Sequence, residues 1–338
     1  MMRSILATCL VLFGCSDPAA SGGGDDDGAV PDASGSNGDM VDAAVTEPIS
    51  VIIIPFENKD DVDVYNNMTD APYINGLMGS TAAYATMFKD ELAQGVPSEP
   101  HYVWMEAGTN VFTDKTFTSD NDASMSNSTA STEHLSTQLD AAGISWKSYQ
   151  EDAPAGKCPI SSSSIISSGQ YAAKHDPFVF FQDVAGNPPS ESNARCAEHH
   201  GTFTDLANDL MADKLPRYTF ITPNLCHDMH GAITCSSGIS NSANVKAGDT
   251  WLSTNLPPII AYAHKHNAVI MLVWDEGNAN NLMPFVMIGD HVKPGPNATL
   301  YNHSSQLATV ERMLGVPKLA TVADAMDFEG MFEPGYLP

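Results

Sequence analysis

Positive charge is scarce in this sequence of 338 residues. It contains 15 Lys and Arg residues against 41 Asp and Glu residues, for a formal net charge of −26 at pH 7. Affinity for nucleic acid comes mostly from Lys and Arg that neutralise phosphates, so this balance argues against a nucleic-acid partner. It does not argue against a small phosphate ester, which a metal ion can bind inside an acidic pocket.

Long apolar runs are also missing, because no stretch reaches the 18 apolar residues that predict a membrane-spanning helix. The shorter run Ile5–Phe13 follows Arg3 and is typical of an export signal. Its end, LFGC at 12–15, resembles a bacterial lipobox, in which cleavage precedes a lipidated Cys. The alternative is an ordinary signal peptide with an incidental Cys. We expect a lipoprotein signal peptide at 1–14 and an exported protein that is secreted or anchored in the cell envelope, at the outer membrane, through Cys15 alone.

Residues 15–47 lack the apolar side chains that a folded segment needs. They are mostly Ser, Gly, Asp, Ala and Pro, a composition typical of a flexible linker. We therefore expect a lipidated Cys followed by a disordered tether over 15–47, and one catalytic domain over 48–338.

Cysteine is rare, and only four cysteines lie in the expected domain: Cys158, Cys196, Cys226 and Cys235. An even number in an exported chain predicts two disulfides. Three pairings are possible, and we favour Cys226–Cys235, which closes a short loop, together with Cys158–Cys196. The alternative, a thiolate zinc site, is disfavoured because the sequence has no C-x2-C pair.

Buried strands are predicted by β-branched runs at 50–55, 217–222, 268–274 and 284–289, with a weaker candidate at 145–149. Helical patterns lie at 130–142, 204–213, 253–265 and 304–314. Strands that alternate with helices predict an α/β fold with a mostly parallel central sheet and helices on both faces.

Polar residues follow three of these strands. Glu57 and Asn58 come after the first, Asp275 and Glu276 come after 268–274, and the segment 223–230 comes after 217–222. Ligand sites in such sheets lie beyond the carboxyl ends of the strands. Crowded carboxylates are unfavourable without a cation, and their oxygens are the ligands that Mg²⁺, Ca²⁺ or Mn²⁺ prefers. The sequence therefore predicts a metal site at this edge of the sheet.

Seven segments in order make the chain resemble the phosphoesterase family of acid phosphatases and phospholipases C, within the alkaline-phosphatase-like superfamily. They are IIIPFENKD (52–60), VPSEPHY (96–102), ISWKSYQEDAP (144–154), KHDPFVFF (174–181), FITPNLCHDMHG (220–231), VWDEG (273–277) and YNHSSQLATVERMLG (301–315). Each segment is weak alone, but together they span nearly all of the expected domain.

The resemblance implies metal-dependent ester hydrolysis through a phosphoseryl intermediate. Ser98 takes the position of the nucleophile, and Glu57, Asn58, Ser98, Asp275 and Glu276 take the positions of metal ligands. The implied cofactor is one or two divalent ions, Mg, Ca, Mn or Zn. Coordination to such an ion lowers the pKa of a serine hydroxyl and directs it at phosphorus.

Six further polar residues are candidates by the same resemblance. His101 stands where the family usually has Asn, and a protonated imidazole there favours an acidic optimum. The Asp-x-His spacing at 228–230 suits either a second metal site or a general acid. We expect His101, His175, Asn224 and Asp228 to bind substrate, and His230 and His303 to be catalytic.

The leading prediction is an acid-phosphatase-like phosphomonoesterase acting on a small phosphate ester or a phospholipid. The alternative is a phospholipase C or another phosphodiesterase on the same scaffold. A sulfatase is disfavoured because the segment Ser98–Tyr102 lacks the Arg of the sulfatase signature. A catalytically inactive surface lipoprotein is disfavoured because the nucleophile and all the expected ligands are present.

Overall fold

The central strand of the fold is buried on both faces. The computed structural model describes residues 48–163 and 170–338. The predicted signal peptide and tether at 1–47 lie outside the described residues. Strand β1 (Ser50–Phe56) is buried from its second residue onward. It pairs in parallel with β6 (Tyr218–Thr222) on one side and with β7 (Ala268–Trp274) on the other.

An eight-stranded sheet forms around this centre, in the order β10-β2-β9-β7-β1-β6-β4-β5. The outer strands are β2 (Ala83–Ala85), β4 (Trp146–Gln150), β5 (His200–Gly201), β9 (Phe285–Ile288) and β10 (Gly295–Asn297). Every neighbouring pair is parallel except the two that β9 forms with β7 and β2. The predicted mostly parallel sheet is confirmed. A second, two-stranded sheet joins β3 (Phe88–Lys89) to β8 (Leu282–Met283).

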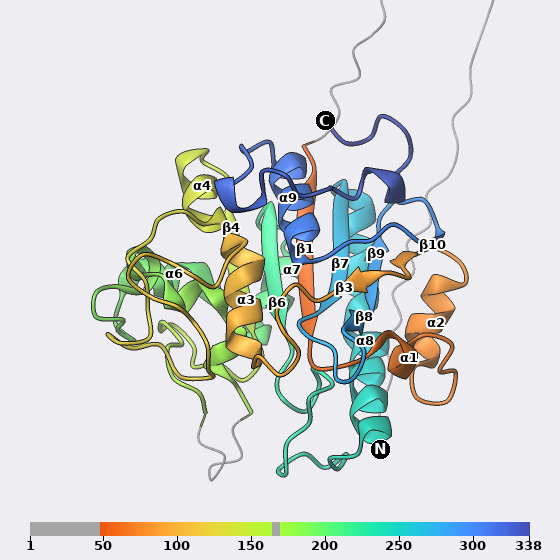
Figure 1. Cartoon of the computed structure of the whole chain (residues 1–338), viewed down its shortest axis with the longest axis horizontal. Coiled ribbons are helices and arrows are strands. Elements are labelled where there is room, and N and C mark those ends of the chain that lie inside the picture. Colours follow the sequence, from red (N-terminus) through yellow and green to blue (C-terminus); the bar gives the residue numbers. More distant parts are fainter. Residues whose placement is uncertain (1–47, 164–169) are drawn as a thin grey trace, which may run out of the picture. The chain divides into compact units, whose positions relative to one another are not determined.

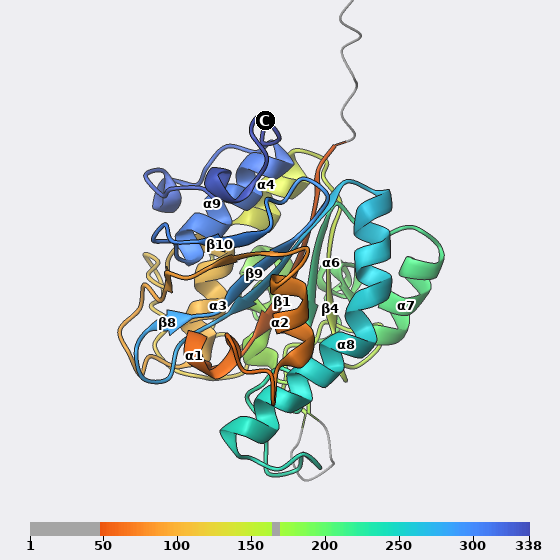
Figure 2. The same cartoon turned by 90° about the vertical axis from the view of Figure 1, so that its right-hand side faces the viewer.

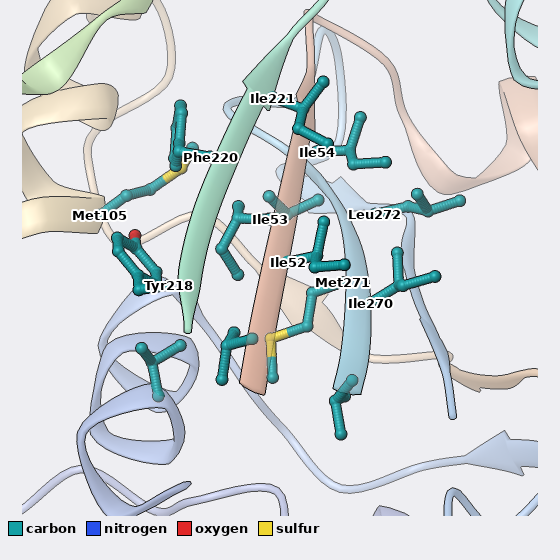
Figure 3. Close-up of a cluster of buried hydrophobic side chains, with 14 of the residues drawn as sticks. Ile52, Ile53, Ile54, Met105, Tyr218, Phe220, Ile221, Ile270, Met271 and Leu272 are labelled. Carbon is teal, nitrogen blue, oxygen red and sulfur yellow. The ribbon is translucent and has the colours of Figure 1, made fainter. Parts of the chain in front are cut away.

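The core is formed by aliphatic side chains that point from the three central strands. Figure 3 shows Ile52 of β1 close to Ile270 and Met271 of β7. On the side of β6, Phe220 points toward Met105 of a covering helix. Both faces of the central strands are therefore covered by apolar side chains, as their uninterrupted hydrophobic runs predict.

Two groups of helices cover the two faces of the sheet (Figures 1 and 2). One group is α3 (Ser98–Ala107), α4 (Leu135–Ala141) and α9 (His303–Leu314). The other is α7 (Phe203–Met211) and α8 (Asn241–Lys265), with α1 (Asp61–Val64) and α2 (Pro72–Met78) packed against α8. Short helices α5 (Gln182–Ala185) and α6 (Ala194–His199) and 3-10 turns at Ala173–His175, Pro177–Phe180, Ala320–Val322 and Glu329–Met331 lie in the connections.

Helix α8 is much longer than the helix predicted over 253–265. It begins after Ser240, whose side chain accepts a hydrogen bond from the backbone N–H of Ala243 at 3.2 Å. Its first half buries Asn244, Gly248 and Asp249 as well as apolar residues, so the apolar stripe on its inward face is interrupted and a sequence pattern does not detect it. The helix also continues through two prolines, which normally end one.

The two predicted disulfides are confirmed, in the favoured pairing. Cys158 is bonded to Cys196, and Cys226 is bonded to Cys235. The second bridge closes the loop that follows β6. Disulfides persist in oxidising surroundings, so the pair indicates an extracytoplasmic location. Within the part of the chain that the structure describes, none of the helices is long and apolar enough to cross a membrane.

Candidate active site

The carboxyl ends of β1 and β7 bring two polar pairs together. Phe56 and Trp274 are register partners at the ends of these parallel strands, so the residues that follow them leave the sheet side by side. The backbone N–H of Asp275 donates to the carbonyl of Phe56 at 3.0 Å. The N–H of Asn58 donates to Asp275 Oδ1, also at 3.0 Å. The acids at 57 and 275 are fully buried.

Ser98 points into this acidic group from the first turn of α3. Its hydroxyl donates to Glu57 Oε2 at 2.9 Å and lies 3.4 Å from Glu276 Oε1. Only 3% of Ser98 is exposed. The apolar pattern of the sequence did not predict a helix at this position. The structure nevertheless brings the predicted nucleophile to an acid from each of the two polar pairs, Glu57 and Glu276.

The three carboxylates of this group perturb one another. Burial, followed by the charges of Glu57 and Glu276, raises the pKa of Asp275 well above its ordinary value. Burial also raises the pKa of Glu276 to about 7, although His101 opposes the shift. For Glu57, burial acts upward, but the charges of His175 and Lys174 outweigh it and lower the pKa to about 2. Three carboxyl groups therefore crowd together beside Ser98, an arrangement that favours either bound protons or a bound cation.

The donor atoms at this edge fit a divalent cation. Asn58 Oδ1 and Asp275 Oδ2 are buried and have no hydrogen-bond partner among the described residues. Asn58 also has a positive φ of 39°, a conformation that Asn tolerates better than most residues. Carboxylate, amide and hydroxyl oxygens form the hard donor set that Mg²⁺, Ca²⁺ and Mn²⁺ prefer.

His101 lies against the acidic pair, with both ring nitrogens occupied. Nδ1 is 3.0 Å from the carbonyl of Pro97, and Nε2 is 3.1 Å from Asp90 Oδ2. Burial lowers the pKa of His101, but the hydrogen bond to Asp90 outweighs it and the net shift is upward. One ligand atom each of His101, Asp275 and Glu276 falls within a 4.8 Å group. The upward shift of its pKa favours the protonated form of His101 beside the acidic pair.

His175 connects two of the predicted strand-end acids. Its Nε2 lies 3.2 Å from Glu57 Oε1 and its Nδ1 lies 3.4 Å from Asp228 Oδ2. The ring stacks on Tyr102 at a centroid distance of 5.0 Å. Asp228 is fully buried, and its backbone carbonyl accepts a hydrogen bond from Glu57 N–H at 2.8 Å. The loop after β6 therefore joins the same edge, as predicted.

The two predicted catalytic histidines occupy different surroundings. His303 begins α9, is buried, and its Nε2 lies 2.7 Å from the carbonyl of Asp275. Burial lowers the pKa of His303 to about 4, so the ring is neutral near pH 7. His230 is exposed, and its ring centroid lies 6.5 Å from that of His175. Of the two predicted catalytic histidines, His230 is therefore the one that solvent can reach.

The hydrogen bonds of Asn224 join it to neighbouring loop residues. Its Nδ2 donates to Asp152 Oδ2 at 2.7 Å, and its Oδ1 accepts from the N–H of Cys226 at 2.9 Å. Its own N–H donates to Glu151 Oε2. These bonds shape the start of the loop that carries Asp228, so the predicted substrate contact of Asn224 stays a prediction.

Sequence reasoning missed two lysines at this edge. Lys59 is buried, and its Nζ donates to the carbonyl of Asn58 at 2.9 Å. Lys174 Nζ lies 3.5 Å from Ser98 Oγ and 2.6 Å from Asp120 Oδ2. Lys174 directly precedes the candidate His175, which was the available signal. Its closeness to Ser98 depends on the folding of the 3-10 turn and could not be inferred from spacing.

The sequence of this chain matches a known protein family. The model of the Phosphoesterase family matches residues 65–317, a range that contains Ser98, Asp275 and Glu276 and begins after Glu57. The chain is 29% identical over 277 residues to the phosphatidylinositol-3-phosphatase of Mycobacterium tuberculosis. The aligned region covers 81% of this chain and 80% of that protein. It is 28% identical over 232 residues to the phosphate-repressible acid phosphatase of Penicillium chrysogenum, covering 66% of this chain and 50% of that protein.

Solved structures resemble the fold. A protein of the alkaline phosphatase superfamily from Vibrio parahaemolyticus superposes with a TM-score of 0.52 and 11% identity, covering 83% of this chain and 71% of that chain. At this identity the likeness concerns the fold alone. The family model, in contrast, matches most of the sequence. The chain therefore belongs to the Phosphoesterase family, has the fold of the alkaline phosphatase superfamily, and is a phosphoric ester hydrolase.

Proposed function

We propose that this chain hydrolyses phosphate monoesters, with Ser98 as the nucleophile and a divalent metal ion as cofactor. The observation that carries the proposal is the position of Ser98 Oγ, 2.9 Å from Glu57 Oε2 and 3.4 Å from Glu276 Oε1. A buried hydroxyl aimed at carboxylates from two strand ends fits a nucleophile better than a helix cap. The names of the relatives, a phosphatidylinositol-3-phosphatase and acid phosphatases, support phosphatase activity on a small or a lipid-borne phosphate.

The residues proposed to bind the ion are those with converging oxygens: Glu57, Asn58, Ser98, Asp275 and Glu276. The buried Asn58 Oδ1 and Asp275 Oδ2, without a hydrogen-bond partner in the described part of the chain, suit this role. When bound, such an ion lowers the pKa of a coordinated hydroxyl and offsets negative charge on a phosphate. This all-oxygen set favours Mg, Ca or Mn over Zn, the fourth ion that the family resemblance implies, because Zn more often binds nitrogen and sulfur ligands.

The reaction we propose has two displacements. Ser98 Oγ forms a bond to phosphorus while the bond from phosphorus to the ester oxygen breaks, with the two oxygens in line. The hydroxyl of Ser98 donates to Glu57 in the structure. Glu57, with a pKa of about 2, is a weak base, so a bound ion would lower the pKa of the hydroxyl and its proton would pass to solvent. The departing alcohol takes a proton, for which the exposed His230 is our candidate donor. Water then hydrolyses the phosphoseryl group, which releases phosphate and restores Ser98.

Of the remaining candidate residues, some are proposed to contact the phosphate and others to position the residues that do the chemistry. His175, 3.2 Å from Glu57, is our candidate for a phosphate contact, and Asp228 orients its ring from the other nitrogen. His101 and His303 contact Asp90 and the backbone of Asp275 respectively, so we propose that they position the acidic pair.

The experiment that tests this function is hydrolysis of p-nitrophenyl phosphate by the purified full chain. We expect activity that is lost on chelation, is restored by a divalent ion, and falls by at least about 10³-fold in Ser98→Ala, as for other activated nucleophiles. Robust hydrolysis by Ser98→Ala would exclude this serine as the nucleophile. Parallel assays of a bis-ester and of phosphatidylcholine distinguish the phospholipase C alternative.

We also propose that the N-terminus anchors the enzyme. The motif at 12–15 and the polar segment to residue 47 favour a lipoprotein with a tether and a catalytic domain at 48–338. Cys15→Ala should move the protein from the membrane fraction to the soluble fraction of a producing bacterium. A membrane fraction that keeps the variant unchanged would contradict the anchor.

A further inference from the structure

A lysine approaches the nucleophile from outside the acidic group. Lys174 lies in the 3-10 turn Ala173–His175, whereas Ser98 begins α3. The Lys174 ammonium lies 3.5 Å from Ser98 Oγ. The side chain is largely covered, with 18% of its surface exposed. A cation within one hydrogen bond of a nucleophile is also within reach of an oxygen on the phosphorus that the nucleophile attacks.

Asp120 fixes the position of this ammonium group. Its Oδ2 accepts from Lys174 Nζ at 2.6 Å, and its Oδ1 accepts from the backbone N–H of Glu99 at 3.0 Å. One carboxylate therefore ties the lysine to the residue next to Ser98. Glu99 in turn accepts from the N–H of Asn121 at 2.7 Å and from Asn127 Nδ2 at 3.1 Å. The segment that carries Asp120 is thus bonded to the start of α3 at several points.

The donors of Lys174 leave room for a ligand. An ammonium group has three N–H donors. The contacts to Asp120 and Ser98 use two of them, which leaves a third, as far as the described residues show. The ion pair with Asp120 keeps this group in place before a ligand arrives, so binding costs little side-chain entropy.

We propose that Lys174, positioned by Asp120, binds a non-bridging phosphate oxygen and makes the site prefer monoesters to diesters. This inference rests on the proposed function and adds that the site selects the more highly charged of the two classes of ester. A monoester near neutral pH carries up to two charges over three non-bridging oxygens. A diester carries one charge over two, because the third oxygen bears a carbon group. A fixed cation beside the nucleophile therefore gains more from the monoester.

The test compares Lys174→Met with Lys147→Met in the purified full chain supplied with a divalent ion. Lys147 is a matched control, because it pairs with Asp209 at 3.4 Å and its side chain is 23% exposed. We expect Lys174→Met to lower kcat/KM for p-nitrophenyl phosphate by about 10²- to 10³-fold, and that for bis(p-nitrophenyl) phosphate by about tenfold at most. The inhibition constant of inorganic phosphate should rise by at least about tenfold. Lys147→Met should change none of these.

Asp120→Asn provides a second variant if Lys174→Met does not fold, as judged by circular dichroism. The amide oxygen can still accept from Glu99 N–H, while the charge that orients Lys174 is lost. We expect weaker phosphate inhibition and a lower ratio of monoester to diester hydrolysis. Equal losses on both esters, or an unchanged inhibition constant, would overturn the inference. A wild-type chain without monoesterase activity would refute the proposed function instead. If wild-type diester hydrolysis is too slow to measure, the phosphate inhibition constant decides.

Discussion

Removal of the metal should make the fold less stable as the pH rises from about 5 to about 7.5. Burial raises the pKa of Glu276 from 4.5 to about 7. Burial and two neighbouring carboxylates also raise the pKa of Asp275. The native chain therefore keeps protons that the unfolded chain releases. Because the native state binds more protons in this window, the free energy of unfolding falls as the pH rises through it.

The size of the effect follows from Glu276. A pKa of about 7 in the native state against 4.5 in the unfolded chain corresponds to about 3 kcal/mol. Glu276 is not completely buried, with 7% of its surface exposed, and solvent screening reduces this to about 2 kcal/mol. Asp275 acts in the same direction. Glu57, whose pKa is lowered to about 2, acts in the opposite direction but only below about pH 4.5, outside the window.

The assay is urea unfolding of the full chain at pH 5 and pH 7.5, followed by tryptophan fluorescence, with chelator and with a saturating divalent ion. The free energy of unfolding of the chelated chain should fall by about 2 kcal/mol or more between pH 5 and pH 7.5. The loaded chain should lose less, because the cation replaces the protons on Asp275 and Glu276. Burial also raises the pKa of Glu99 and of Glu311 to about 7, and the decline that they cause is common to both conditions. Glu276→Gln should show a smaller decline without metal. Equal stability of the chelated chain at both pH values, or an equal decline with and without the ion, would refute the reasoning.

Two predictions concern the scaffold. Burial acts to lower the pKa of His134, but hydrogen bonds to Asp183 and Glu106, each at 3.0 Å, raise it to about 9 from 6.5. This stabilisation, about 3 kcal/mol, is complete below pH 6.5 and is lost as the pH rises through about 9. Urea unfolding should therefore show that His134→Gln destabilises more at pH 6 than at pH 9.5, and equal losses would contradict this. A Cβ on Gly248 would lie 2.4 Å from Met229 Cγ, so Gly248→Ala should lower stability by about 1–3 kcal/mol in thermal unfolding. Gly76→Ala, where the Cβ meets nothing within 4 Å, is its control and should be neutral or slightly stabilising.

The strands and the acids at their ends could be predicted because their signals are local. The runs at 50–56 and 268–274 are uninterrupted and apolar, and a polar pair follows each of them directly. Parallel strands then place such pairs at one edge of the sheet. The direction of β9 could not be predicted in this way, because a buried apolar run has the same composition in either orientation.

The parts that sequence reasoning missed depend on contacts between distant segments. Helix α3 has no regular apolar stripe, because it buries Ser98, Glu99, His101 and Glu106 beside its apolar residues. Its burial reflects the hydrogen bonds of these side chains. Lys174 reaches Ser98 from 76 residues away in the chain. Its partner Asp120 lies in a segment with no recognised pattern, so only the folded chain reveals this pair.

The pairing of Phe56 with Trp274 has a consequence for how this site can change. The two rings stack at a centroid distance of 5.0 Å, and the next residue of each strand is a candidate metal ligand. Successive residues of a strand face opposite sides of the sheet. Deleting one residue from β1 or β7 would therefore turn a carboxylate away, even with every polar residue retained. The number of residues in these two strands is thus part of the site, and natural length variation should be confined to the loops.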